Sequence, residues 1–331
     1  MPAAENVAVA DAARRRGVDL QLELTSCQVE TATAPLHTAA ELGAELGRLR
    51  RIVAEAAQEC GAVLLAVGLP PTVPDEFPIT DTPRYRQIAD RYGMVAREQG
   101  ICGCHVHVEV PDEDTAVLVC NRLRPWLPVL LSLSANSAMY RNADTGYASW
   151  RSILWGRWPT AGPPPHLESA ADYHETVQGL QDMGAMLDDG MVYWDVRPSA
   201  SFPTVEVRVA DVPATVAETV LLATLARAAV MTALNEIRCG ATEVRIPEPL
   251  LRARYWLAAR YGLTGCTRQA LPSFVAAISP ALHMLGEYDY ATSELGRICA
   301  DGNGAIRQQR AWGRSGDVAD VLAEAAEATL R

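Results

Sequence analysis

Histidine and glutamate side chains alternate with valines in residues 101–110, which read ICGCHVHVEV. In a β-strand successive side chains point to opposite faces, so His105, His107 and Glu109 would share one face. The valines on the other face are typical of a protein core. Two imidazoles and a carboxylate are costly to bury unless each has a partner. The segment therefore predicts a strand whose polar face suits metal binding, although on this strand alone a solvated face is an equally good interpretation.

Three other segments repeat the alternation of apolar and polar residues. They are residues 20–33, 192–198 and 204–211. If all four segments share one sheet with their aliphatic faces against helices, the opposite face collects the polar side chains. Those side chains are Glu23, Glu30, His105, His107, Glu109, Asp195, Arg197, Glu206 and Arg208.

The residue types on this predicted surface point to phosphoryl transfer. Carboxylates with a few imidazoles form a hard ligand set that suits Mg²⁺ or Mn²⁺, and interspersed arginines suit phosphate or carboxylate ligands. A metal-bound, phosphorylated substrate fits both halves of the set. Two alternatives stay open. One is a structural salt-bridge network; the other is an iron or metal-hydrolase site made by His105, His107 and a carboxylate, which the arginines fit less well.

The composition restricts the class of function. The 331 residues carry a formal charge of -11 and a pI near 5.1, which argues against nucleic acids and anionic membranes as partners. The sequence has no apolar run of membrane-spanning length and no signal peptide, so we expect a cytoplasmic protein. It contains no lysine, which excludes a Walker A loop, a pyridoxal Schiff base and a lysine nucleophile.

The cysteines and the Gly302-Asn303-Gly304 sequence give little evidence of function. The eight cysteines are scattered, and the only close pair, Cys102 and Cys104, has a C-x-C spacing with no second half of a zinc site elsewhere. We expect reduced thiols. The Gly302-Asn303-Gly304 sequence predicts a turn rather than a phosphate-binding loop.

Helices must position the predicted strands. A capping box at Thr38–Glu41 begins a helix that Gly61 ends, and a second box at Thr215–Glu218 lies at the start of a long helix. The other expected elements are a strand at 62–68, a proline-rich loop at 69–83, helices at 84–99, 112–134, 172–188, 213–236 and 250–262, an irregular segment at 135–165, and a helical C-terminal third with a last helix from 317. The pattern predicts an α+β fold of mainly antiparallel strands, with a polar catalytic face and helices on the other face. We expect one domain over residues 20–331 and a loosely held segment at 1–19.

Five collinear motifs give the chain a specific resemblance from about Glu23 to the C-terminus. They are SCQVETAT at 26–33, GCHVHV at 103–108, DTGYASWRSILWGRWPTAGPP at 144–164, WDVRPS at 194–199 and TVEVRVAD at 204–211. In order and spacing they resemble the glutamate–cysteine ligase type 2 family of bacterial carboxylate–amine ligases. The resemblance implies a glutamine-synthetase-like catalytic fold. It also implies use of ATP and Mg²⁺, with Mn²⁺ as a substitute, to phosphorylate an amino-acid carboxylate that an amine then attacks.

The resemblance also implies roles for individual residues. The metal ligands around the ATP phosphates would be Glu23, Glu30, His105 and Glu206. Arg208 and Arg197 would act in catalysis by contacting the phosphate or the acyl-phosphate as negative charge develops. His107 would either support a metal ligand from behind or face the substrate. Arg151 would bind the amino-acid carboxylate, with a structural loop arginine as an equal alternative. The partners would be small amino-acid and amine substrates, and a homo-oligomer stays open.

Two departures from the family pattern affect the functional expectation. Family members usually begin with a strand that carries a G-x-E-x-E motif, whereas Glu5 is the only glutamate in residues 1–19. Where the family tends to have Gly-Thr-His-Pro, residues 68–71 read GLPP. We therefore expect a ligase domain without the usual first strand. The alternative is a non-catalytic or re-purposed member that acts by binding, because the N-terminal metal-binding carboxylates are absent.

Overall fold

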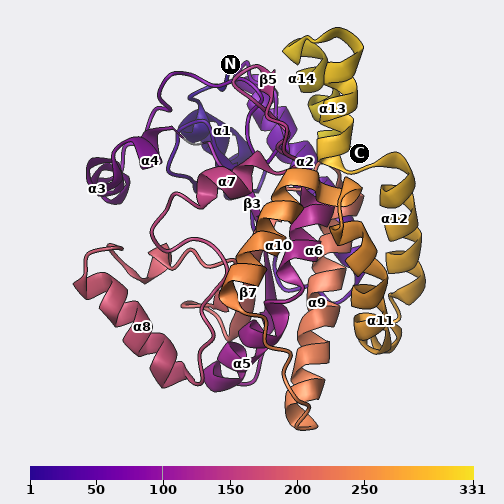
Figure 1. The fold of residues 1–331 in the computed structure, drawn as a ribbon. Helices are drawn as coiled ribbons and strands as arrows, with labels where there is room; N and C mark the ends of the chain where they lie inside the picture. The colour runs from indigo at the N-terminus through magenta and orange to yellow at the C-terminus, as the bar shows by residue number, and fades with distance from the viewer. Residues whose placement is uncertain (99) are drawn as a thin grey trace.

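The computed structural model describes residues 1–98 and 100–331. The helices are α1 Asn6–Arg14, α2 Ala39–Glu59, α3 Pro83–Tyr92, α4 Met94–Arg97, α5 Glu113–Leu123, α6 Leu127–Ser134, α7 Trp150–Trp155, α8 Ala170–Asp182, α9 Val216–Arg238, α10 Glu248–Tyr261, α11 Thr267–Leu285, α12 Tyr288–Asp301, α13 Gly304–Ser315 and α14 Val318–Thr329. The strands are β1 Gln21–Leu22, β2 Val29–Glu30, β3 Gly103–Glu109, β4 Met139–Tyr140, β5 Ala143–Asp144, β6 Val196–Pro198 and β7 Thr204–Asp211. Figure 1 shows α6, α9 and α10 together in the centre of the molecule, with α11 and α12 beyond them.

A three-stranded antiparallel sheet in the order β3-β7-β6 carries the alternating segments. The central strand β7 pairs along its length with β3, and its first half pairs with β6. Between Cys104 and Val106 the register shifts, because two residues of β3 span the same length as three residues of β7. This β-bulge lies next to Arg208. The antiparallel α+β class that the sequence predicted is confirmed.

The expectation that all four alternating segments share one sheet is wrong for residues 20–33. β1 and β2 pair only with each other. Beyond β1 the backbone turns to residues 78–80, since Thr80 donates to the carbonyl of Leu24 at 2.9 Å and Ser26 donates to the carbonyl of Pro78 at 2.8 Å. Backbone groups that already form these hydrogen bonds cannot also pair with β3, β6 or β7.

Residues 62–68, which we expected to form a strand, also lie outside any sheet. The backbone amide of Ala66 donates to the Thr329 hydroxyl at 2.8 Å, and the amide of Gly68 donates to the carbonyl of Asn136 at 3.0 Å. Contacts with the C-terminal helix and with a loop therefore satisfy this backbone in place of strand pairing.

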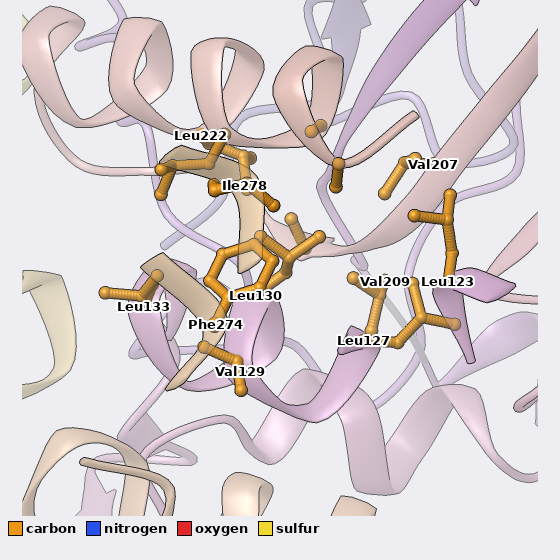
Figure 2. Packing of buried hydrophobic residues seen from close by; sticks show 14 of the residues in the cluster. Leu123, Leu127, Val129, Leu130, Leu133, Val207, Val209, Leu222, Phe274 and Ile278 are labelled. Atoms are coloured by element: carbon orange, nitrogen blue, oxygen red, sulfur yellow. The ribbon is translucent and has the colours of Figure 1, made fainter. Parts of the chain in front are cut away.

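The apolar face of the sheet packs against α5, α6 and α9, and α11 packs on α6 and α9. Figure 2 shows Val207 and Val209 of β7 facing this core, with Leu130 and Phe274 packed in its centre. Val196 and Val205 are fully buried in the same cluster. Alternate residues of β7 therefore lie on the core side, and Glu206 and Arg208 lie on the other side, as the strand period requires.

Both predicted capping boxes are present, at Thr38–Glu41 and Thr215–Glu218. Two predicted helices are each divided in the structure. The helix expected at 84–99 breaks into α3 and α4 at Gly93, whose φ of +54° favours glycine; its expected end, Gln99, lies outside the described residues. The helix expected at 112–134 bends by 70° between α5 and α6, at the prolines that the sequence already contained.

Part of the N-terminal segment forms the helix α1. Residues of α1 such as Val9, Ala12 and Ala13 are buried against α2. The sequence signal was weak because alanines, rather than large apolar residues, make most of this contact.

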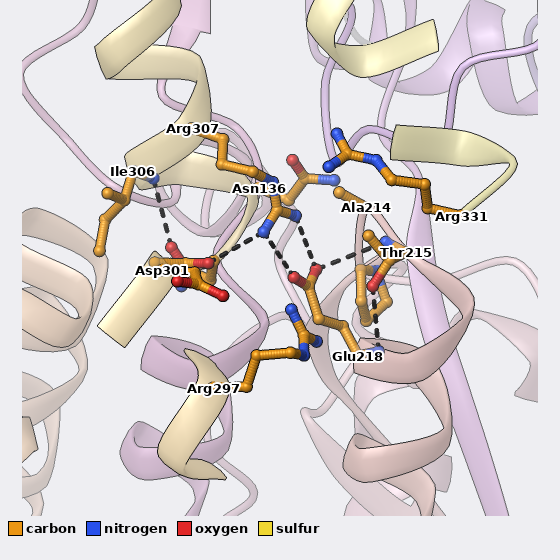
Figure 3. Close-up of polar contacts among 12 residues, drawn as sticks. Asn136, Ala214, Thr215, Glu218, Arg297, Asp301, Ile306, Arg307 and Arg331 are labelled. Atoms are coloured by element: carbon orange, nitrogen blue, oxygen red, sulfur yellow. Dashed lines mark hydrogen bonds and ion pairs between the residues drawn. The ribbon is translucent and has the colours of Figure 1, made fainter. Parts of the chain in front are cut away.

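The long helix α9 is apolar and long enough to cross a membrane, but most of its apolar stretch is buried inside the fold. It packs against α2, α5, α11 and α12. Its N-terminus is joined to the C-terminal helices: Arg307 donates to both carboxylate oxygens of Glu218 at 2.7 and 3.0 Å (Figure 3). The Gly302-Asn303-Gly304 sequence forms the turn between α12 and α13, as predicted, and Asn303 caps α13.

Candidate active site

His107, Glu206 and Arg197 form one row across the three strands. Glu206 of β7 is the register partner of His107 on β3 and of Arg197 on β6. Side chains of direct cross-strand partners project from the same face of a sheet. The sheet therefore brings the imidazole of His107 beside the carboxylate of Glu206 and the guanidinium of Arg197, which are near each other in the sequence but far from His107.

Glu206 is the buried carboxylate that binds both Arg197 and Arg208. Its side chain is 5% exposed, the Nε of Arg197 donates to its Oε2 at 2.8 Å, and Arg208 donates to its Oε1. Burial alone would raise the pKa of this carboxyl, but Arg208, Arg197 and His105 lower it to about 2. Glu206 is therefore ionised at neutral pH, and both of its oxygens have arginine partners.

The two histidines flank the same carboxylate and are neutral. His105 Nδ1 lies 3.4 Å from Glu206 Oε1 and 3.4 Å from a donor nitrogen of Arg208. Burial, followed by the charge of Arg208, lowers the pKa of His105 well below its usual value. Burial also lowers the pKa of His107, whose side chain is 37% exposed.

Glu23 and Glu30 come from the β1–β2 hairpin and meet beside His105. Glu30 Oε1 lies 4.0 Å from His105 Nδ1. Burial raises the pKa of Glu30 to about 8, helped by the charge of Glu23 and a hydrogen bond between the two carboxyls. A like charge beside a carboxyl disfavours its ionisation, and a bound cation would relieve that repulsion. The hairpin thus reaches the polar face although it is not part of the sheet.

The four predicted metal ligands do not form one ligand set in the structure. Within residues 1–98 and 100–331, no group of three or more metal-ligating side chains is arranged to hold an ion. Both oxygens of Glu206 bind arginine, so this residue does not fit the role of ligand. Glu23 and Glu30 do fit that role, because their adjoining carboxyls are hard oxygen donors without an arginine partner in the part of the chain that the structure describes.

The alternative of an iron or hydrolase site on the central strand does not fit the geometry. A triad of His105, His107 and Glu206 would need the Glu206 oxygen that Arg208 occupies. Burial raises the pKa of both Cys102 and Cys104 to about 11, so both are protonated thiols at neutral pH. The alternative of a structural salt-bridge network also fits the buried groups Glu206, Arg197 and Arg208.

Arg151, for which the sequence left a substrate-binding role and a structural role equally open, is buried in the structure. Its side chain is 3% exposed, and its guanidinium donates to the backbone carbonyls of Arg208 and Val209 at 3.4 Å each. It therefore lies behind Arg208, against the backbone of β7.

Sequence reasoning did not assign roles to two buried carboxyls beside the arginines. Asp195 precedes β6, and burial raises its pKa to about 6 against the opposing charges of Arg151 and Arg208. Asp211 ends β7 and has no exposed surface. The alternation placed Asp195 on the polar face, but nothing local marks Asp211, because its partners come from residues 136–151.

Comparisons with known proteins show which family the chain resembles over most of its length. A family model described as "Glutamate-cysteine ligase family 2" matches residues 2–324. A protein of Mycolicibacterium smegmatis named "Putative glutamate--cysteine ligase 2-3" is 58% identical, over 99% of this chain and 93% of its own length. A protein of Nocardia farcinica named "Putative glutamate--cysteine ligase 2-1" is 55% identical, over 99% and 89%. A protein of Salinispora tropica named "Putative glutamate--cysteine ligase 2" is 46% identical, over 93% and 84%.

Proposed function

The chain belongs to glutamate–cysteine ligase family 2, and from this premise we propose that it is an ATP-dependent ligase that joins an amino-acid carboxylate to an amine. In the reaction a carboxylate oxygen attacks the γ-phosphorus of ATP and ADP leaves. The amine nitrogen then attacks the acyl carbon of the acyl-phosphate, and phosphate leaves. The acid is glutamate or a similar amino acid, and cysteine is the first amine to test.

The observation that carries the proposal is the row His107–Glu206–Arg197 with Arg208 beside it. The reaction moves negative charge through a phosphoryl group and an acyl-phosphate, and preorganised guanidinium groups stabilise such charge. Glu206 holds Arg197 and Arg208 at fixed positions on the strands. His107, at the accessible edge of the row, would contact the substrate.

The proposal includes Mg²⁺, or Mn²⁺ in its place, as the metal that accompanies ATP. Glu23 and Glu30 would hold it at the edge of the site. A bound cation supplies charge neutralisation at the phosphates. The antiparallel sheet with a polar face is consistent with a glutamine-synthetase-like fold, and we expect the reaction to occur in the cytoplasm, where ATP is available.

A second candidate is a family member that binds these ligands without catalysis. The observation in its favour is the double arginine contact of Glu206, which removes one of the four carboxylate and imidazole ligands that the family resemblance implied.

ADP release separates the two candidates. The chain is mixed with ATP, Mg²⁺, glutamate and a panel of amines that includes cysteine, and each component is omitted in turn. A ligase releases ADP only with one acid–amine pair, and the joined product is identified by its mass. Arg208→Met should abolish turnover, whereas Arg252→Met, at an exposed position of α10, should retain it. Binding of ATP without turnover under any combination would refute the ligase and favour the binding protein.

A further inference from the structure

Asp211 at the end of β7 joins the sheet to residues 136–151. Its Oδ2 accepts hydrogen bonds from the backbone amide of Asn136 at 2.8 Å and from the hydroxyl of Ser137 at 2.7 Å. Its Oδ1 accepts a hydrogen bond from the hydroxyl of Ser149 at 2.8 Å. A fully buried carboxylate with three short hydrogen bonds is firmly held. The loop that contains these donors is therefore fixed relative to β7.

Arg151 depends on the same carboxylate. Its backbone amide donates to the Ser137 hydroxyl at 3.0 Å, and its guanidinium lies 3.8 Å from Asp211 Oδ1. The guanidinium also donates to the carbonyls of Arg208 and Val209, beside the β-bulge of β7. Asp211 thus supplies the opposite charge for a buried cation that contacts the irregular part of the strand.

Two glycines leave room for this pair. A Cβ on Gly68 would lie 2.7 to 2.9 Å from three side-chain atoms of Asp211, and a Cβ on Gly103 would lie 2.5 Å from a terminal nitrogen of Arg151. Any larger residue at either position would displace the carboxylate or the guanidinium. Glycine at positions 68 and 103 therefore allows the backbone to pass close to Asp211 and Arg151.

We infer that Asp211 is a positioning residue for the proposed ligase reaction: through Ser137, Ser149 and Arg151 it holds the bulged part of β7 from which Arg208 reaches Glu206. The inference rests on the proposed function, because Arg208 is the group that would stabilise the transferring phosphoryl charge. Replacing the carboxylate by an amide removes the charge that balances Arg151 and leaves fewer acceptors for the three donors. Arg151 would then shift, and the carbonyl of Arg208 would lose its donor.

The inference is tested with Asp211→Asn and Gly103→Ala, and with Glu218→Gln as the matched control. Gly103→Ala keeps Asp211 but displaces Arg151, and it serves if Asp211→Asn fails to fold. Glu218 is also a buried carboxylate with an arginine partner and a backbone donor, but it lies at the start of α9 (Figure 3). All three changes should lower the melting temperature. Only the first two should affect kcat, by about 10- to 100-fold, with KM for the acid unchanged within about twofold.

Hydrogen exchange gives a readout that does not need activity. The amides of residues 207–210 should exchange faster in Asp211→Asn and Gly103→Ala than in Glu218→Gln. If the unaltered chain turns over and Asp211→Asn has the same kcat, the inference is wrong and the ligase assignment stands. If the unaltered chain does not turn over, the ligase assignment fails, and unchanged exchange at 207–210 would overturn the positioning role separately.

Discussion

Arg197 and Glu206 are direct cross-strand partners, and the Nε of Arg197 donates to Oε2 of Glu206 at 2.8 Å. The second carboxylate oxygen binds Arg208. One buried carboxylate thus orients two guanidinium groups. This arrangement gives the polar face a fixed pair of positive groups, and most of the expected behaviour of the site follows from it.

Glu206→Gln should lower both stability and activity. The amide keeps the shape of the side chain, but it leaves two buried arginines without a negative partner, which costs about 3 kcal/mol of unfolding free energy. ADP release should fall by about 100-fold or more, because Arg197 and Arg208 lose their fixed positions. Urea unfolding and the ADP assay measure the two effects.

Glu294→Gln is the control for the stability effect. Glu294 accepts a hydrogen bond from the Nε of Arg297 at the same 2.8 Å, but the two lie one turn apart on α12. Such a local pair contributes less than about 1 kcal/mol. Equal losses in the two variants would contradict the central role of Glu206.

Asp195 should make stability depend on pH. Burial raises the pKa of this carboxyl to about 6 in the folded chain, whereas the unfolded chain ionises near its ordinary value of 3.8. Between these two pH values the folded state holds the additional proton, so stability falls as pH rises from about 4 to about 6 and is level above that. The total loss is about 3 kcal/mol. Asp195→Asn removes this contribution.

The measurement is urea unfolding of the unaltered chain and Asp195→Asn at several pH values from 4 to 7. The difference between the two proteins isolates Asp195 from other titrating groups. The amide variant should gain stability relative to the unaltered chain as pH rises. A difference that stays constant over this range would refute the raised pKa.

Mg²⁺ should stabilise the chain through Glu23 and Glu30. A cation that binds the folded state alone raises the melting temperature, and it competes with the proton that Glu30 holds at neutral pH. The melting temperature should therefore rise with Mg²⁺ more at pH 8 than at pH 5. Glu30→Gln should abolish the rise.

Glu109→Gln is the matched control for the metal effect, because Glu109 ends β3 in an exposed position. It should keep the full response to Mg²⁺. NaCl at equal ionic strength separates specific binding from screening. A response that is the same in Glu30→Gln and in the unaltered chain would exclude these carboxyls as the metal site.

Arg50→Met should destabilise the fold without changing kcat. The Arg50 guanidinium joins α2 to the start of α9 and the end of α14: it donates to the carbonyls of Pro213, Ala214 and Thr329 and to the Thr219 hydroxyl at 2.8 to 3.3 Å. Loss of these hydrogen bonds should cost about 2–3 kcal/mol.

Arg48→Met, two residues away on the same helix, is the control. Arg48 pairs only with Glu45 on the exposed side of α2 among the described residues, and such a pair contributes little. The urea midpoint should therefore change for Arg50→Met and stay nearly the same for Arg48→Met. Similar midpoints for both variants would refute the role of Arg50.

Alternation along the sequence was sufficient to predict which side chains share a face. Alternation is a local property of an extended backbone, so His105 with His107, and Glu206 with Arg208, were assigned together correctly. The capping boxes at Thr38 and Thr215 were equally local, since each depends on residues within one helical turn. The family also followed from the sequence, because five motifs in one order are specific without any knowledge of contacts.

Which of these faces meet depends on long-range packing that the sequence pattern does not specify. The row His107–Glu206–Arg197 depends on strand register, the exclusion of residues 20–33 from the sheet depends on hydrogen bonds to residues 78–80, and the burial of Arg151 depends on Asp211. Apart from Arg197 and Glu206, which are nine residues apart, these contacts join residues that lie tens of residues apart in the sequence. The sequence pattern specifies the side that a residue faces, but the backbone and charge partners that distant segments supply determine its final contacts.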